Sequence, residues 1–262
     1  MSHQAGQRGI VSDLLASIGV LTAIPVARQP RRRAATLGLA PVAGVLLGLL
    51  AGGAAAGGHW LFPDSAGALL AAALTIGGLA LLTRGLHLDG LADTADGLGP
   101  LGGPAAGLAA MRRPDIGPFG VVALVLILVI QCAALARDIT LGRGFASVLV
   151  AVVAGRLAMT WAGVPGVPAA RPDGLGAWVA GSVPRPAALA WTGLAVAGTL
   201  APAAFGAGWT ALRLTAALAA ALAAGVALRR HAVRRLGGIT GDVLGAICEL
   251  AVLAALLVTA IR

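Results

Sequence analysis

Three aspartates stand within eight positions of a 262-residue chain that has only ten acidic residues. Asp89, Asp93 and Asp96 are separated by steps of four and three residues, so on a helix their side chains share one stripe. Three like charges on one stripe repel each other, and Mg²⁺ would offset that repulsion while keeping positions free for phosphate oxygens. The stripe therefore predicts a Mg²⁺ site for a diphosphate, although a helix cap at Asp89 or a solvated helix face would have the same spacing.

The composition is that of a membrane protein. The chain is 58% hydrophobic and 11% charged, with a mean hydropathy of +0.92. We therefore predict an all-α fold, a polytopic helix bundle forming a single membrane domain over residues 1–262, with membrane lipid as a partner. The net charge of +9 comes from arginines in the intervals between apolar segments, and with only 3% aromatic residues it does not indicate nucleic-acid binding. Cys132 and Cys248 lie in apolar runs, which predicts free, buried thiols.

Seven apolar segments are long enough to span a bilayer, which takes about 20 residues each. They are residues 36–58, 66–83, 117–136, 144–163, 187–205, 209–228 and 240–261. The segments at 36–58 and 187–205 are rich in alanine and glycine, which predicts close helix packing. Residues 1–35 hold a shorter apolar run, which we interpret as an interfacial or re-entrant helix on the cytoplasmic side.

The arginines predict the orientation. With the N-terminus inside, most of the 19 arginines fall in cytoplasmic intervals, and only Arg137, Arg143 and Arg262 fall in external ones. By the positive-inside rule, the chain is expected to be a multi-pass protein of the bacterial plasma (inner) membrane, with a cytoplasmic N-terminus. The polar interval 84–116, which carries the aspartates, then becomes a cytoplasmic catalytic loop.

This interval also holds candidates for binding a phosphorylated substrate. Arg84, Arg112 and Arg113 could clamp phosphate oxygens, with Asp115 beside them, although the arginine pair is equally explained as a positive-inside pair. His87 is a candidate general base. Because it lies two residues before Asp89, it points away from the stripe unless Gly85 or Gly90 breaks the helix.

The last apolar segment adds two acidic residues on one face, Asp242 and Glu249, which are seven residues apart. Asp242 could serve the substrate or only complement the helix N-terminus. Glu249 lies inside an apolar segment, where a charge costs roughly 2.5–3.5 kcal/mol on insertion scales. Arg156 also lies inside an apolar segment and carries a similar energetic cost. Either the two form a structural pair, or Glu249 and Arg156 face a cavity that receives substrate.

The aspartate motif also resembles that of a known family. The run from Gly85 to Gly97 reads GLHLDGLADTADG and is similar to the signature of cobalamin synthases, which are adenosylcobinamide-GDP ribazoletransferases. LTAIPV from Leu21, GPFGV from Gly117 and the run from Gly237 to Glu249 also match, so the resemblance spans nearly the whole chain in order. Leu88 and Ala23 depart mildly, since an acidic and a basic residue are common there in the family.

The resemblance implies an integral membrane enzyme of cobalamin biosynthesis. It would be a Mg²⁺-dependent phosphotransferase that joins adenosylcobinamide-GDP to α-ribazole, or to α-ribazole 5′-phosphate, giving adenosylcobalamin, or its 5′-phosphate, and GMP. On this hypothesis Asp89, Asp93 and Asp96 hold the metal with help from Asp242, and His87 or a carboxylate accepts the hydroxyl proton. An oligomer is compatible with the sequence.

Two other functions stay open at this point. A CDP-alcohol phosphotransferase also holds Mg²⁺ with aspartates on membrane helices, but its core has an arginine where this chain has Asp93. A membrane transporter could use Arg156 and Glu249 along an ion or substrate pathway. Against a transporter, the acidic residues gather in one interval and the sequence has no inverted repeat.

Overall fold

The computed structural model describes residues 13–25 and 34–261, and this part of the chain is almost entirely helical. Its β pairing is limited to one bridge between Ala169 and Ile239. The helices are η1 (Ala34–Leu39), α2 (Ala40–Leu61), α3 (Ser65–Leu82), α4 (Leu86–Leu98), α5 (Pro104–Ala110), α6 (Pro118–Thr140), α7 (Gly144–Ala162), α8 (Gly174–Val179), α9 (Arg185–Leu200), η2 (Ala201–Phe205), α10 (Gly208–Leu236) and α11 (Gly241–Thr259). The all-α prediction is confirmed.

Seven helices in the described residues are long and apolar enough to cross a membrane, which matches the seven predicted segments. The main difference is α10, which continues to Leu236, past the predicted end at residue 228. The added turns consist largely of arginine, alanine and leucine, which are good helix formers, and the helix ends only at Gly237, whose φ of +82° suits glycine. Cys132 and Cys248 are free, as predicted, but only Cys248 is buried and Cys132 is partly exposed.

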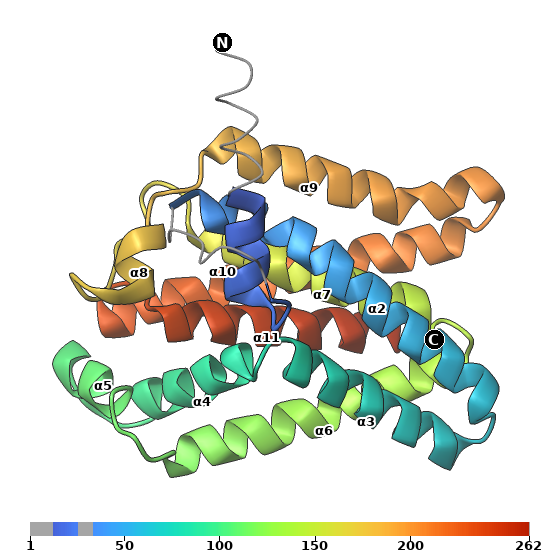
Figure 1. Cartoon of the computed structure of the whole chain (residues 1–262), viewed down its shortest axis with the longest axis horizontal. Helices are drawn as coiled ribbons and strands as arrows, with labels where there is room; N and C mark the ends of the chain where they lie inside the picture. The colour runs from blue at the N-terminus through green and yellow to red at the C-terminus, as the bar shows by residue number, and fades with distance from the viewer. Residues whose placement is uncertain (1–12, 26–33, 262) are drawn as a thin grey trace.

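The long helices lie side by side, with α7 and α11 at the centre (Figure 1). In the most apolar 18 residues of α7, 72% of the residues are buried, whereas in those of the α9 segment only 11% are. Helix α9 therefore lies at the edge of the bundle. Close packing of 36–58 is confirmed: a Cβ at Gly48 on α2 would lie 2.8 Å from Leu149 on α7. The same prediction is wrong for α9, because Gly193 and Gly198 face open space.

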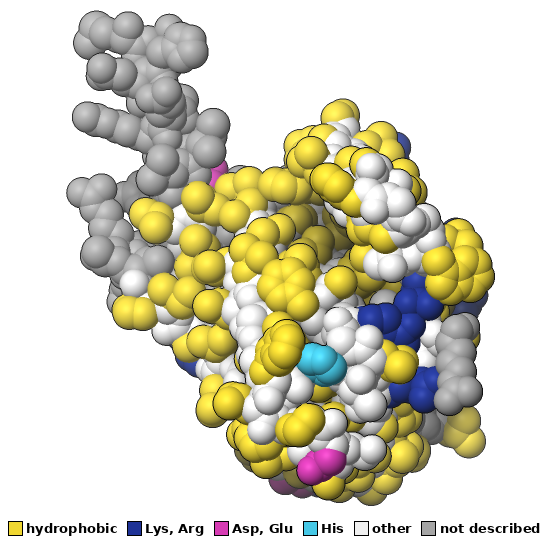
Figure 2. All heavy atoms as spheres, turned by 90° about the vertical axis from the view of Figure 1, so that its right-hand side faces the viewer, with side chains coloured by type: hydrophobic (Ala, Val, Ile, Leu, Met, Phe, Trp, Pro, Cys, Tyr) yellow, Lys and Arg dark blue, Asp and Glu magenta, His cyan; other side chains and the backbone are white. Residues whose placement is uncertain are grey.

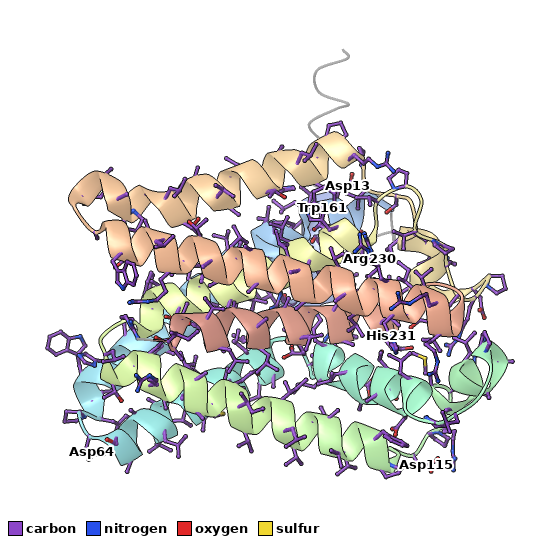
Figure 3. All side chains as sticks on the ribbon, turned by 180° about the vertical axis from the view of Figure 1, so that it is seen from behind. Asp13, Asp64, Asp115, Trp161, Arg230 and His231 are labelled. Atoms are coloured by element: carbon purple, nitrogen blue, oxygen red, sulfur yellow. The ribbon has the colours of Figure 1, made fainter. Side chains whose placement is uncertain are left out.

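The polar elements gather at one end of the bundle. Figure 1 shows α5 and α8 at the same end as the C-terminal half of α10 and the outer end of α4. Asp115, Arg230 and His231 lie at this end, and Asp64 lies at the opposite one (Figure 3). The opposite end has mostly hydrophobic and uncharged side chains at its surface, with a group of arginines on one side (Figure 2). The two ends therefore differ: the short helices and polar loops gather at one end, and the other is mostly apolar.

Residues 13–21 form a short helix that crosses the long ones (Figure 1, dark blue). The chain after it is tied to the end of α3, because the Ala23 amide donates to the Leu82 carbonyl at 2.5 Å. The described part of this helix is shorter than a membrane span. The rest of that segment, residues 1–12 and 26–33, lies outside the described residues.

Candidate active site at the crossing of α4 and α11

The aspartate motif lies on α4, and the predicted loop at 84–116 is in fact largely the two helices α4 and α5. Arg84 and Gly85 turn the chain between α3 and α4 with φ values of +55° and +69°. From Leu86 the helix then runs unbroken to Leu98. Asp89 is exposed, and Asp93 and Asp96 are half-buried. The three aspartates therefore lie on one continuous helix, as their spacing predicts.

Glycines on both helices allow α4 to cross α11 closely. A Cβ at Gly90 would lie 2.6 Å from the Asp242 carbonyl oxygen, and one at Gly245 would lie 3.0 Å from the His87 carbonyl oxygen. Larger side chains would push the backbones apart. The contact brings Asp242, in the first turn of α11, beside the α4 stripe. The Thr240 hydroxyl fixes that turn by accepting from the Val243 amide and donating to the Asp242 carboxylate, each at 3.2 Å.

Negative charge accumulates at this crossing. Burial and, to a smaller extent, the carboxylates of Asp242, Asp89 and Asp96 together raise the pKa of Asp93 from 3.8 to about 6, against the opposing effect of Arg171. Three carboxylates and one cation, Arg171, act on this group, so the net charge around Asp93 is negative. A divalent cation would remove the imbalance, and Asp89, Asp93 and Asp242 offer the oxygen donors that Mg²⁺ prefers. The residues therefore fit the predicted metal.

Asp96 has a second role that the sequence reasoning missed. Its carboxylate accepts hydrogen bonds from the amides of Gly117, at 2.7 Å, and Gly120, at 2.9 Å. Gly117 is the N-cap residue of α6 and has no side chain of its own to cap the helix, so Asp96 supplies the missing acceptor from a neighbouring helix. The signal in the sequence was the start of α6 at Gly117-Pro118 without a capping side chain.

His87 does not join the stripe. Because α4 is continuous, His87 points toward α11 and is buried, 1% exposed. Neither ring nitrogen has a hydrogen-bond partner within the described residues, and burial lowers the pKa of His87 well below 6.5, with Arg156 adding to the effect. His87 is therefore a neutral, enclosed imidazole.

Among the described residues, one group of three histidine, cysteine, aspartate or glutamate side chains has all its potential metal-binding atoms within 4.8 Å of one another. This group consists of His87, Cys248 and Glu249. The positive charge of Arg156 acts on all three, which opposes a cation at this place. The aspartates are not drawn together in this way, as expected for like charges without a bound ion.

Arg156 and Glu249 line one small cavity of about 20 Å³ inside the bundle, together with Gln131. The Glu249 carboxylate accepts a hydrogen bond from the Gln131 amide at 3.1 Å, and no ion pair within 4.0 Å joins it to Arg156 in the described part of the chain. The buried Arg156 Nε has no partner there either. The two charges thus balance each other at a distance across a cavity that has room for about one water molecule.

Two of the predicted phosphate-binding arginines, Arg112 and Arg113, lie at the exposed polar end, between α5 and α6. Arg112 pairs with Asp173 at 3.6 Å, and Arg113 pairs with Asp115 at 3.2 Å, all with side chains at least 60% exposed. Such exposed pairs are weak, worth about 0–1 kcal/mol, so a phosphate could replace the carboxylate partners. Arg84 instead donates to the Gly19 carbonyl at 3.2 Å.

Arg171 is the cation that the sequence analysis did not single out. It lies in the segment between α7 and α8 and acts electrostatically on both Asp93 and Asp242. One of its nitrogens donates to the Leu108 carbonyl of α5 at 2.9 Å, while its Nε has no partner within the described residues. The bridge between Ala169 and Ile239 explains this placement, because it joins the Arg171 segment to the start of α11.

Fold and site together define a multi-pass, all-helical membrane protein with an acidic site at the polar end of its bundle. The chain belongs to the cobalamin-5-phosphate synthase family, whose model matches residues 13–260. It is 43% identical to the adenosylcobinamide-GDP ribazoletransferase of Frankia casuarinae over 255 residues, covering 92% of this chain and 91% of the relative. It is 42% identical to that of a Nocardioides species, covering 94% and 97%. No solved structure matches the chain.

Proposed function

We propose that this chain is an adenosylcobinamide-GDP ribazoletransferase, a membrane enzyme of cobalamin biosynthesis. Its relatives carry that name, and the alignments cover 91% and 97% of their lengths. The observation that carries the proposal is the mutual repulsion of Asp93 with Asp89 and Asp242 at the α4–α11 crossing, because a divalent cation held by carboxylates is the usual partner of nucleotide phosphates.

In the proposed reaction, a hydroxyl oxygen of α-ribazole, or of its 5′-phosphate, forms a bond to the phosphorus attached to cobinamide. The bond from that phosphorus to the GMP oxygen breaks, and GMP leaves. We assign Asp89, Asp93 and Asp242 to Mg²⁺, which would neutralise charge on the phosphoryl oxygens. Asp96 contributes to the local charge while it caps α6.

We assign the acceptance of the hydroxyl proton to a carboxylate of the crossing and not to His87. His87 is 1% exposed, whereas Asp89 on the same helix is open to solvent. Arg171 contributes positive charge beside Asp93 and Asp242. Arg112 and Arg113, which have only exposed carboxylate partners, would hold the nucleotide phosphates.

We also propose that the polar end faces the cytoplasm of a bacterial plasma membrane. Arg112, Arg113 and Arg171 belong to the intervals at that end, as do the arginines at the end of α10. The opposite end is mainly hydrophobic (Figure 2). The positive-inside rule therefore supports a cytoplasmic active site, where soluble nucleotides are available.

Purified protein in detergent provides the test. It should release GMP from adenosylcobinamide-GDP only when Mg²⁺ and α-ribazole, or its 5′-phosphate, are both present, and an equal amount of the joined corrinoid should form. CDP-alcohol donors serve as the control and should give no CMP. GMP release without the acceptor would indicate a hydrolase, and the absence of GMP release in the complete mixture would refute the proposal.

A further inference from the structure

The α9 side of the bundle contains a groove that the proposed reaction does not use. It has a cavity of about 500 Å³ between α2, α7, α9 and α10, lined almost entirely by apolar side chains. Toward the polar end it is followed by a cavity of about 250 Å³ between α7, α9 and α10. A third cavity, of about 300 Å³, lies next to the second and shares Arg229 with it.

The three cavities follow α10 in order. Leu218 lines the first, Leu222 and Val226 line the second, and Arg230 and Arg234 line the third. Each step of four residues places a side chain next to the previous one, so the row runs along α10 and winds gradually around it. From Leu218 to Arg230 the helix rises by about 18 Å, comparable with the ~15 Å of hydrocarbon in one bilayer leaflet. The groove is therefore apolar at membrane depth and basic at its polar end.

The polar groups in the walls of the groove are already hydrogen-bonded within the protein, including the hydroxyls of Thr192 and Thr199. The Trp161 indole nitrogen donates to the Thr192 hydroxyl at 2.9 Å, and that of Trp191 donates to the Gly38 carbonyl at 2.8 Å. Both tryptophans thus present only their apolar faces. Because α9 packs loosely and its glycines face open space, the protein itself does not fill the gap. An acyl chain is the apolar filler that a membrane supplies.

The arginines at the basic mouth have no acidic partner among the described residues. Arg230 and Arg234 are exposed and have no hydrogen bond or ion pair among the described residues, while Arg229 donates to the Trp161 carbonyl at 2.8 Å. Arg230 lies on the side of α10 toward Trp161, whereas His231 lies on the opposite edge of the helix (Figure 3). The mouth therefore opens toward α9, away from the aspartates of α4.

We propose that this groove binds one anionic phospholipid of the leaflet at the polar end, with its phosphate at Arg230 and Arg234 and one acyl chain between α7, α9 and α10. The arginines favour an anionic headgroup, because opposite charges attract. The apolar lining of the rest of the groove favours an acyl chain, which a free phosphate or nucleotide does not have. The site is separate from the acidic crossing, so it holds or fails independently of the proposed transferase activity.

The test uses delipidated full-length protein and native mass spectrometry, with phosphatidylglycerol and phosphatidylcholine of identical acyl chains as probes. The parent protein should bind phosphatidylglycerol at least about tenfold more tightly. The double variant R230Q/R234Q should lose affinity by roughly 30-fold, since each charge contributes about 1 kcal/mol. R230K/R234K should keep most of the affinity. R137Q/R213Q, with the same loss of charge in other parts of α6 and α10, should bind like the parent.

A matched pair on α9 tests the groove itself. Ala195 lines the large cavity, whereas Ala197 is exposed and does not. Ala195→Phe should therefore abolish phosphatidylglycerol retention and Ala197→Phe should leave it intact. Equal binding of the two lipids, unchanged binding in R230Q/R234Q, or equal behaviour of the two phenylalanine variants would overturn the proposal. So would competition by inorganic phosphate or GMP, or a dimer that Ala195→Phe dissociates.

Discussion

Replacing Asp93 with asparagine removes one carboxylate from the α4–α11 crossing while keeping the size of the side chain. In metal-free protein this change should stabilise the fold above pH 6. The pKa of Asp93 is about 6 in the folded protein, against an ordinary 3.8. Between these values the folded state holds a proton that the unfolded state releases, so stability falls as pH rises from 3.8 and the loss is complete above pH 6.

The size of the effect follows from the same pKa difference. At 1.36 kcal/mol per pH unit the full cost would be ~3 kcal/mol. Because the Asp93 side chain is only half-buried, solvent screening reduces this to about 1 kcal/mol. With Mg²⁺ the order should reverse: the parent protein gains stability from the ion, and Asp93→Asn gains little and loses GMP release by about 100-fold or more.

Unfolding of the detergent-solubilised protein, followed by tryptophan fluorescence between pH 5 and 8 with chelator or Mg²⁺, measures both effects. Asp115→Asn is the control, since Asp115 is exposed and pairs only with Arg113. The reasoning fails if Asp93→Asn is less stable than the parent at pH 7.5 in chelator, or if it keeps Mg²⁺-dependent GMP release.

Two further substitutions test the structure around the site. Asp96→Ala should destabilise the protein by about 1–2 kcal/mol in thermal unfolding, because the amides of Gly117 and Gly120 lose their acceptor; a change as small as that of Asp115→Ala would exclude the capping role. Gly90→Ala should cost about 1–3 kcal/mol and lower kcat, because its Cβ meets the Asp242 carbonyl at 2.6 Å. Gly78→Ala on α3, where a Cβ meets nothing within 4 Å, should leave both quantities unchanged, and equal kcat values for the two variants would contradict the close crossing.

Local patterns in the sequence were sufficient to predict the helices. In a bilayer, the backbone amides and carbonyls of an apolar run of about 20 residues find hydrogen-bond partners within a helix. Length and hydropathy were therefore enough to locate all seven candidate spanning helices. The spacing of Asp89, Asp93 and Asp96 placed them on one helix for the same local reason. The end of α10 was missed because hydropathy falls at Arg229 and Arg230 although the helix continues.

Contacts between distant segments could not be predicted in this way. Asp96 caps α6 through two amides that lie 21 and 24 positions later in the sequence. The approach of Arg171 to Asp93 likewise depends on the bridge between Ala169 and Ile239. No periodicity within one helix contains that information. For the same reason the expected packing of α9 was wrong: its small residues are compatible with close contact, but the neighbouring helices leave a groove there.

The central claim is that carboxylates from α4 and α11 together hold one divalent ion. Mn²⁺ suits the same oxygen ligands as Mg²⁺ and is visible by electron paramagnetic resonance, so a Mn²⁺ titration of purified protein tests the claim directly. The account predicts one bound ion whose affinity drops by at least about tenfold in Asp242→Asn and in Asp93→Asn, and is unchanged in Asp115→Asn. Full Mn²⁺ affinity in Asp242→Asn, or its loss in Cys248→Ala instead, would contradict it.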